Sequence, residues 1–86
     1  MEVNLINFIM ELQIKVIRNH KPVEGLTAMV VDGPGSWPEI AAISNSKGEF
    51  SFQVERDGVY KMHLFSDDNV KTILVKSGEQ LIIDLD

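Results

Sequence analysis

Apolar and polar residues alternate along most of the chain, which is the pattern of strands with one buried face. The clearest run is EFSFQV, in which Phe50, Phe52 and Val54 alternate with Ser51 and Gln53. Segments rich in Gly, Pro, Asn and Asp interrupt the alternation and indicate turns. We expect seven strands, at residues 12–18, 26–31, 39–44, 49–54, 59–65, 70–75 and 80–86.

The spacing of these strands predicts an all-β fold. Turn signals recur roughly every 8–12 residues, as they do in a β-sandwich. No gap between strands is long enough for a crossover helix, so we expect antiparallel sheets. Phe50 and Phe52 face the same way and a hairpin would bring Tyr60 within their reach, so these rings are expected to lie in the core. The prediction is a seven-stranded antiparallel β-sandwich formed by residues 12–86.

The first eleven residues fit two descriptions and form an N-terminal extension, residues 1–11. Leu5, Phe8 and Ile9 follow a helical spacing, whereas Val3, Leu5 and Ile9 also follow the phase of a strand. We expect either an extra edge strand or a short helix that covers the sandwich. The alternative is an exposed apolar segment, residues 3–10, through which the chain forms a homo-oligomer.

Length and charge exclude several classes of protein. A chain of 86 residues forms one domain with a thin core. It contains no cysteine, which excludes disulfides and thiolate metal sites. The net charge of -5 opposes binding to nucleic acids and anionic membranes. No stretch approaches the roughly 20 apolar residues of a membrane span, so we expect no membrane insertion.

The compartment stays open. The N-terminal sequence MEVNLINFIMEL has neither the basic start nor the small-residue cleavage site of a secretory signal peptide. The chain is therefore expected to be cytoplasmic or a fragment of a larger exported protein.

Three turn motifs occur in a specific order. The stretch NHKPVEG supplies Pro22, Val23 and Gly25 of a hairpin pattern, and SNSKGEF follows with Asn45 where Asp is usual. The third motif, DGVYKMHL, has Asp57 in place of a proline. We expect Asn45 and Asp57 to hydrogen-bond the backbone that follows them, and Gly48 to adopt a positive φ. In this order the motifs resemble the carboxypeptidase regulatory-like domain family of transthyretin-like (prealbumin-like) sandwiches. The resemblance implies a transthyretin-like Greek key and an accessory role without catalysis or cofactor.

Two groups of proteins with related folds do carry out chemistry. B-type repeats of bacterial surface adhesins cross-link a first-strand lysine to a last-strand Asn or Asp, with the help of a buried acid. Lys15 and Asp84 are available here, but Leu64 stands at the position of the acid. Hydroxyisourate hydrolases rely on histidines and a C-terminal Tyr-Arg-Gly-Ser, whereas this chain ends in LIIDLD. We expect no catalytic residues and no enzymatic activity.

The segment GPGSWPE contains the only tryptophan of the chain. Pro34 and Pro38 restrict this loop and lower the entropy lost on binding. Tryptophan is enriched among interface hot spots, although Trp37 fits equally well as a plug at the end of the core. We predict a protein-binding site formed by Trp37, Pro34, Pro38 and Glu39.

A ligand- or ion-binding module is the alternative function. Asp67, Asp68 and Asn69 offer the oxygen ligands that Ca²⁺ takes, and the Trp37 loop offers a surface for a carbohydrate. A sugar platform normally has more than one exposed aromatic ring. The expected function is therefore an accessory or protein-interaction module of a larger protein or assembly, with a partner that the sequence does not identify.

Overall fold

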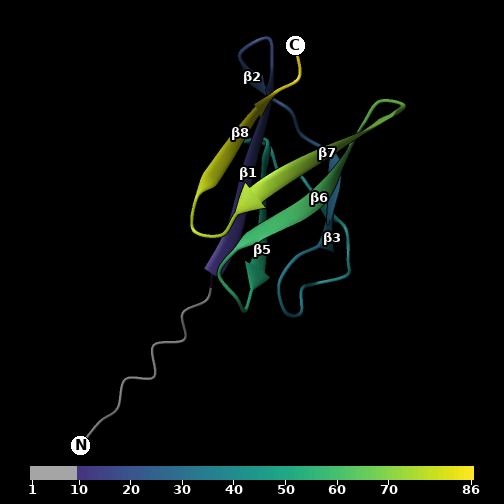
Figure 1. Cartoon of the computed structure of the whole chain (residues 1–86). Coiled ribbons are helices and arrows are strands. Elements are labelled where there is room, and N and C mark those ends of the chain that lie inside the picture. The colour runs from purple at the N-terminus through teal and green to yellow at the C-terminus, as the bar shows by residue number, and fades with distance from the viewer. Residues whose placement is uncertain (1–9) are drawn as a thin grey trace, which may run out of the picture.

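The computed structural model describes residues 10–86, which form strands and connecting segments without a helix (Figure 1). The all-β class is thereby confirmed. The strands form two four-stranded sheets. They are β1 (Met10–Arg18), β2 (Lys21–Pro22), β3 (Thr27–Asp32), β4 (Ala42–Ile43), β5 (Glu49–Val54), β6 (Val59–Ser66), β7 (Asn69–Lys76) and β8 (Gln80–Asp84).

The two sheets differ in how they are built. In the first, which we call sheet A, β1 pairs with β2 and β5 along one edge and with β8 along the other. In the second, sheet B, the strands follow the order β4-β3-β6-β7. Side chains from both sheets meet in a single hydrophobic core, as in a sandwich.

The pairing is antiparallel with one exception, so the expectation of antiparallel sheets needs a correction. β8 lies parallel to β1, with Gln13 opposite Gln80 and Ile17 opposite Asp84. The physical reason is that the chain changes sheets between β7 and β8, so β8 pairs with β1 and not with the strand that precedes it. Only strands joined by a tight hairpin within one sheet must pair antiparallel.

An eighth strand appears where we expected only a turn. The short β2 pairs with the end of β1 through Arg18 opposite Lys21. Asn19 and His20 both have positive φ, at 54° and 62°, as the two central residues of a type I′ turn do. This tight hairpin brings two residues of the predicted turn into the sheet.

The aromatic core is confirmed, although its geometry differs from the one expected. Phe50, Phe52 and Tyr60 are buried. We expected a hairpin between the strands that hold them, yet β5 lies in sheet A and β6 in sheet B. The Asp57-Gly58 turn therefore joins the two sheets, and the rings meet across the core rather than side by side in one sheet. Asp57 accepts a hydrogen bond from the Ser77 hydroxyl instead of from the backbone that follows it.

The turn before β5 follows its sequence prediction. Asn45 Oδ1 accepts hydrogen bonds from the backbone N–H groups of Lys47 and Glu49, at 2.9 and 3.0 Å. Gly48 has a φ of 74°, and a Cβ there would lie 2.4 Å from the carbonyl oxygen of Val16. Only glycine fits that position without a shift of the backbone.

The first strand begins at the first residue that the structure describes. β1 starts at Met10, so Met10 and Glu11 belong to the sheet rather than to an extension. The predicted edge strand or short helix, and the homo-oligomer through residues 3–10, concern a segment that lies almost entirely outside the described residues. Within residues 10–86 there is no helix of the length and apolarity needed to cross a membrane.

Candidate binding surfaces

The predicted site begins in a loop that is held firmly at its start. The ring of Tyr60 packs where a Cβ on Gly33 would lie, at 2.2 Å. The Tyr60 hydroxyl lies 3.1 Å from the carbonyl oxygen of Pro34 and 2.7 Å from that of Arg56, so its proton bonds to one or is shared between both. Because Tyr60 is fully buried, these contacts fix the base of the loop against the core.

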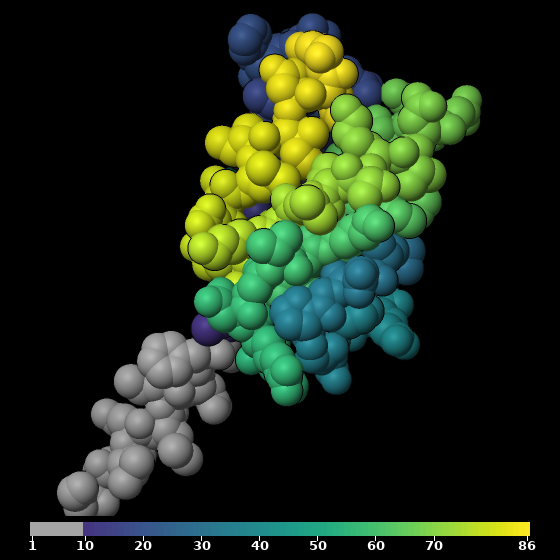
Figure 2. Space-filling view, in the orientation of Figure 1, coloured from purple at the N-terminus to yellow at the C-terminus, as the bar shows by residue number. Residues whose placement is uncertain are grey.

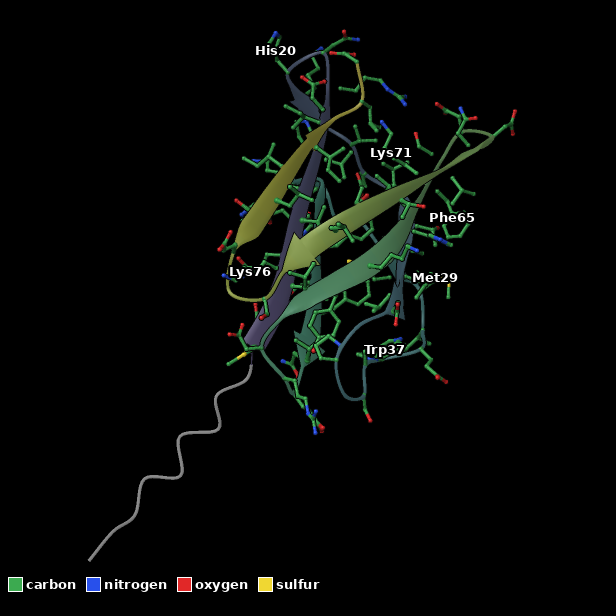
Figure 3. All side chains as sticks on the ribbon, viewed as in Figure 1. His20, Met29, Trp37, Phe65, Lys71 and Lys76 are labelled. Atoms are coloured by element: carbon green, nitrogen blue, oxygen red, sulfur yellow. The ribbon has the colours of Figure 1, made fainter. Side chains whose placement is uncertain are left out.

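Trp37 combines the two roles that the sequence left open. Its side chain is partly buried and packs against the hydrophobic core. It also lines a surface hollow of about 270 Å³ together with Pro38, Gln53 and Glu55. Figure 3 shows Trp37 at the end of the molecule opposite His20. Trp37 is therefore a partial plug of the core whose remaining surface is open to a partner.

The other predicted residues of this site are not equivalent. Pro38 lines the same hollow as Trp37, and Glu39 lines a smaller one beside Trp37. Pro34 instead packs near Gly58, where a Cβ on the glycine would lie 2.9 Å from the proline ring. The structure thus brings three of the four residues to the surface hollows, and Pro34 serves to hold the loop.

Another hollow continues along β5 and was missed by sequence reasoning. It has a volume of about 260 Å³ and shares Pro38 and Gln53 with the hollow of about 270 Å³ beside Trp37. Ile40 lies at its margin with 74% of its surface exposed, which is the largest exposure among the large hydrophobic residues described. The sequence prediction assigned Ile40, Ala41 and Ala42 to a strand, so their apolar side chains were not recognised as part of an exposed surface.

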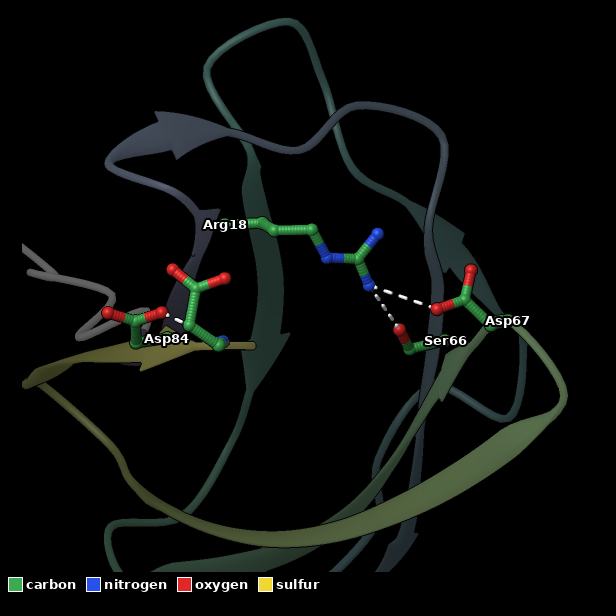
Figure 4. A network of polar contacts seen from close by, with 5 residues as sticks. Arg18, Ser66, Asp67 and Asp84 are labelled. Atoms are coloured by element: carbon green, nitrogen blue, oxygen red, sulfur yellow. Dashed lines mark hydrogen bonds and ion pairs between the residues drawn. The ribbon is translucent and has the colours of Figure 1, made fainter.

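The Asp67–Asn69 turn is shaped by an ion pair. Arg18 Nη2 lies 3.0 Å from Asp67 Oδ2 and donates a hydrogen bond to the Ser66 hydroxyl at 3.3 Å (Figure 4). Arg18 thereby contacts one of the carboxylate oxygens that the calcium hypothesis treats as ligands. Among the described residues, no cluster of three or more His, Cys, Asp or Glu side chains has the geometry to hold a metal ion.

The residues considered for cross-linking chemistry lie on neighbouring strands but outside the core. Lys15 pairs with Ile82, two positions before Asp84 on the parallel strand β8. Both side chains belong to the outer face of sheet A, because the alternate residues Ile14 and Val16 are the buried ones. Leu64, at the position of the acid, is fully buried in the other sheet, whereas Lys15 lies outside the core.

The outer face of sheet B holds most of the exposed large hydrophobic side chains of the described residues. Seven large hydrophobic side chains are exposed among the described residues, and five of them lie on this face. These five are Ile43, Val59, Phe65, Val70 and Leu74. β6 and β7 lie in front of β1 and β5 in Figure 1, and Figure 2 shows their green and yellow-green atoms at the surface.

The register of the strands makes part of this face continuous. Ile43, Thr27, Phe65 and Val70 stand in one row across all four strands of sheet B. Met29, in the next row, points outward beside Phe65 (Figure 3). Sequence reasoning noticed the inner phase of these strands only. The apolar outward positions were a signal that could have located this surface.

The outer face of sheet B also carries charged residues. The outward positions of β6 and β7 carry Lys61 and Lys76 and no acidic residue. His63 also lies there, with its ring edge-on to Phe65 at a centroid distance of 6.4 Å. On β3, however, Asp32 stands opposite Lys61, and Lys76 lies 3.8 Å from Glu79, so acidic residues of the chain itself accompany both lysines.

No protein-family model matches the sequence, and no curated protein matches it. The resemblance to carboxypeptidase regulatory-like domains accordingly stays a prediction. The function is best inferred from the surfaces described above.

Proposed function

We propose that the chain is a non-catalytic protein-interaction module. The observation that carries this proposal is the gathering of five of the seven exposed large hydrophobic residues of the described chain on the outer face of sheet B. Single exposed hydrophobic residues are common on protein surfaces, but a cluster of them on one face marks an interaction site.

The chemistry of the face indicates the kind of protein it binds. An apolar patch on the partner would cover Ile43, Phe65 and Val70, which form one row of the sheet together with Thr27.

The resemblance to transthyretin-like accessory domains supports the same function. The order of the turn motifs is compatible with the all-β architecture. The hydrogen bond from Tyr60 to the carbonyl oxygen of Arg56, four residues upstream, also has the form of the tyrosine corner found in Greek-key sandwiches. A transthyretin-like Greek key is therefore our proposal for the topology, and an accessory role in a larger protein or assembly is our proposal for the context.

The hollows beside β5 are a second candidate contact surface. Trp37, Pro38 and Glu39 line them on a loop whose base is fixed by Tyr60. The exposed Ile40 favours a peptide or loop of a partner at this place. A pre-ordered loop loses little entropy on binding.

Matched substitutions on the two outer faces test the proposal. Ile43 and Ile82 are exposed isoleucines, at 69% and 59%, on sheet B and sheet A respectively. We expect Ile43→Asp to abolish recovery of a partner on the immobilised protein, whereas Ile82→Asp leaves recovery unchanged. Titration of the purified partner by calorimetry should show the same contrast. Equal binding by both variants would refute the assignment of the face.

Two further measurements separate this function from the alternatives. Ile40→Asp reports on the hollows beside β5, and loss of binding in that variant alone would move the site there. Thermal unfolding with calcium and with a panel of glycans tests a ligand-binding module. A large rise of the melting temperature with one of these ligands would contradict a module that binds only protein.

A further inference from the structure

The far edge of β7 offers backbone groups for strand pairing. The N–H of Ser77 donates to the carbonyl oxygen of Gly58 at 3.0 Å, so these two residues are a hydrogen-bonded pair. This pair shows which of the residue pairs between β6 and β7 are hydrogen-bonded. Because such pairs alternate along an antiparallel ladder, Val75, Ile73 and Lys71 direct their backbone groups toward β6. The N–H and C=O groups of Val70, Thr72 and Leu74 therefore point away from the sheet, and no described strand pairs with them.

The first half of β7 is accessible from several sides. Lys71 has the same phase as the buried Val75, yet its side chain is exposed. The β6–β7 hairpin therefore extends beyond the cover that sheet A provides, and Figure 1 shows its tip projecting from the body of the molecule. Val70 and Leu74 are 55% and 64% exposed. A long, exposed and apolar edge strand is a template for pairing with another strand.

The sequence of β7 is complementary to itself when two copies pair antiparallel about Thr72. Val70 of one copy then stands opposite Leu74 of the other, on both sides of the symmetry axis, and Thr72 stands opposite Thr72. All three positions direct their backbone groups outward, so the ladder can form without any change in β7. Aliphatic pairs and Thr–Thr pairs directly opposite each other stabilise antiparallel sheets.

Charges favour the same register. One position before the start of β7, Asp68 of one copy comes near Lys76 of the other in this register, and this contact also occurs twice. Lys76 lies 3.8 Å from Glu79 of its own chain, so the exposed lysine has an intramolecular acid nearby as well. A register centred on Lys71 would instead place two lysines opposite each other, which is destabilising. The register centred on Thr72 also pairs nearly the whole length of β7.

We propose that the chain forms a two-fold symmetric dimer through antiparallel pairing of β7 with β7 of a second copy, centred on Thr72. The two copies of sheet B join into one continuous sheet, and their apolar outer faces become one wider surface. This dimer uses the edge of sheet B, whereas the proposed function uses its face. The dimer and the proposed function can therefore be refuted independently of each other.

Cysteine cross-linking tests the register. The native chain contains no cysteine, so a single introduced thiol reacts without competition. In a hydrogen-bonded antiparallel pair the Cα atoms are about 5.5 Å apart, within the range of a disulfide. We expect Thr72→Cys to form a disulfide-linked dimer on mild oxidation. Val70→Cys should not, because the two Val70 positions are four residues apart in register, or roughly 13 Å. A mixture of Val70→Cys and Leu74→Cys chains should cross-link to each other.

A proline substitution tests the pairing itself. The N–H of Thr72 points away from β6, and proline is tolerated at such positions of an edge strand. We expect Thr72→Pro to be folded by circular dichroism and monomeric by sedimentation velocity, while Thr72→Ala remains a dimer like the parent chain. A parent chain that stays monomeric at high concentration would overturn the proposal. Cross-linking of Val70→Cys alone as readily as Thr72→Cys would overturn the register.

Discussion

Both sheets pack on the same core and expose their outer faces to solvent, yet the two outer faces differ in polarity. Sheet A exposes one large hydrophobic residue on its outer face, Ile82, whereas sheet B exposes five. On sheet A the exposed positions interact with one another, since Glu11 accepts hydrogen bonds from Gln13 and Ser51 at 3.0 and 3.3 Å. On sheet B, aliphatic and aromatic side chains stand among outward residues such as Lys61 and Lys76.

This difference separates what folding requires from what binding requires. A two-sheet fold needs apolar residues only on the inner faces. The outer face of sheet A is mainly polar, as this requirement allows. The outer face of sheet B goes beyond it, because exposed hydrophobic side chains there add nothing to the core and raise the risk of aggregation. Our proposal that a partner covers this face would account for its composition.

The largest expected effect is on the core that both faces share. Phe52→Ala should lower the free energy of unfolding by about 3–5 kcal/mol, because a buried ring leaves a cavity. Ser51, which precedes Phe52 in β5, points to the outer face of sheet A. Ser51→Ala should lower the free energy of unfolding by less than about 0.5 kcal/mol. Urea unfolding measures both. Similar losses in the two variants would show that the inner and outer phases of β5 are not distinct.

A smaller effect is expected at Trp37. Because its side chain is partly buried, Trp37→Ala should lower stability by about 2 kcal/mol, roughly half the cost of removing a fully buried aromatic ring. Its fluorescence should lie between that of a buried and that of an exposed indole, with partial quenching by acrylamide. Ser36→Ala, at the exposed neighbouring residue, serves as the control. A stability loss as large as that of Phe52→Ala would identify Trp37 as a core residue alone.

The contrast between the faces can be measured without a partner. An apolar fluorescent dye such as ANS should bind the folded protein through the outer face of sheet B. Ile43→Asp should reduce this binding clearly, and Ile82→Asp should leave it nearly unchanged. Neither variant should change the free energy of unfolding by more than about 0.5 kcal/mol, since both side chains are exposed. Equal dye binding in the two variants would remove the distinction between the faces.

The smallest effect on stability is expected from removing the ion pair between the two sheets. Arg18 of sheet A contacts Asp67 and Ser66 of the β6–β7 hairpin in sheet B. Both charged side chains are largely in contact with solvent, with exposures of 38% and 70%. Arg18→Ala should therefore lower stability by about 0.5 kcal/mol at low salt and by less at high salt. A loss above about 2 kcal/mol would mean that this contact holds the sheets together.

Local features were predictable where a residue acts on its own neighbours. The positive φ of Gly48 and the hydrogen bonds of Asn45 follow from glycine and Asx chemistry within one turn. The same reasoning failed for Asp57, whose partner Ser77 lies twenty residues further along the chain. The candidate site shows the same division. The sequence located Trp37, whereas the hollow that it shares with Gln53 exists only because β5 packs beside the loop.

The alternation of side chains by itself determined that this protein is all-β and which residues face inward, because the period of a strand is a property of its own backbone. Only the tertiary structure decided which strands are neighbours. The parallel pairing of β8 with β1 and the change of sheet between β5 and β6 depend on how the whole core is covered. The same holds for the apolar face and the free edge of β7. Each outward residue looks ordinary in the sequence, and its meaning comes from the strands beside it.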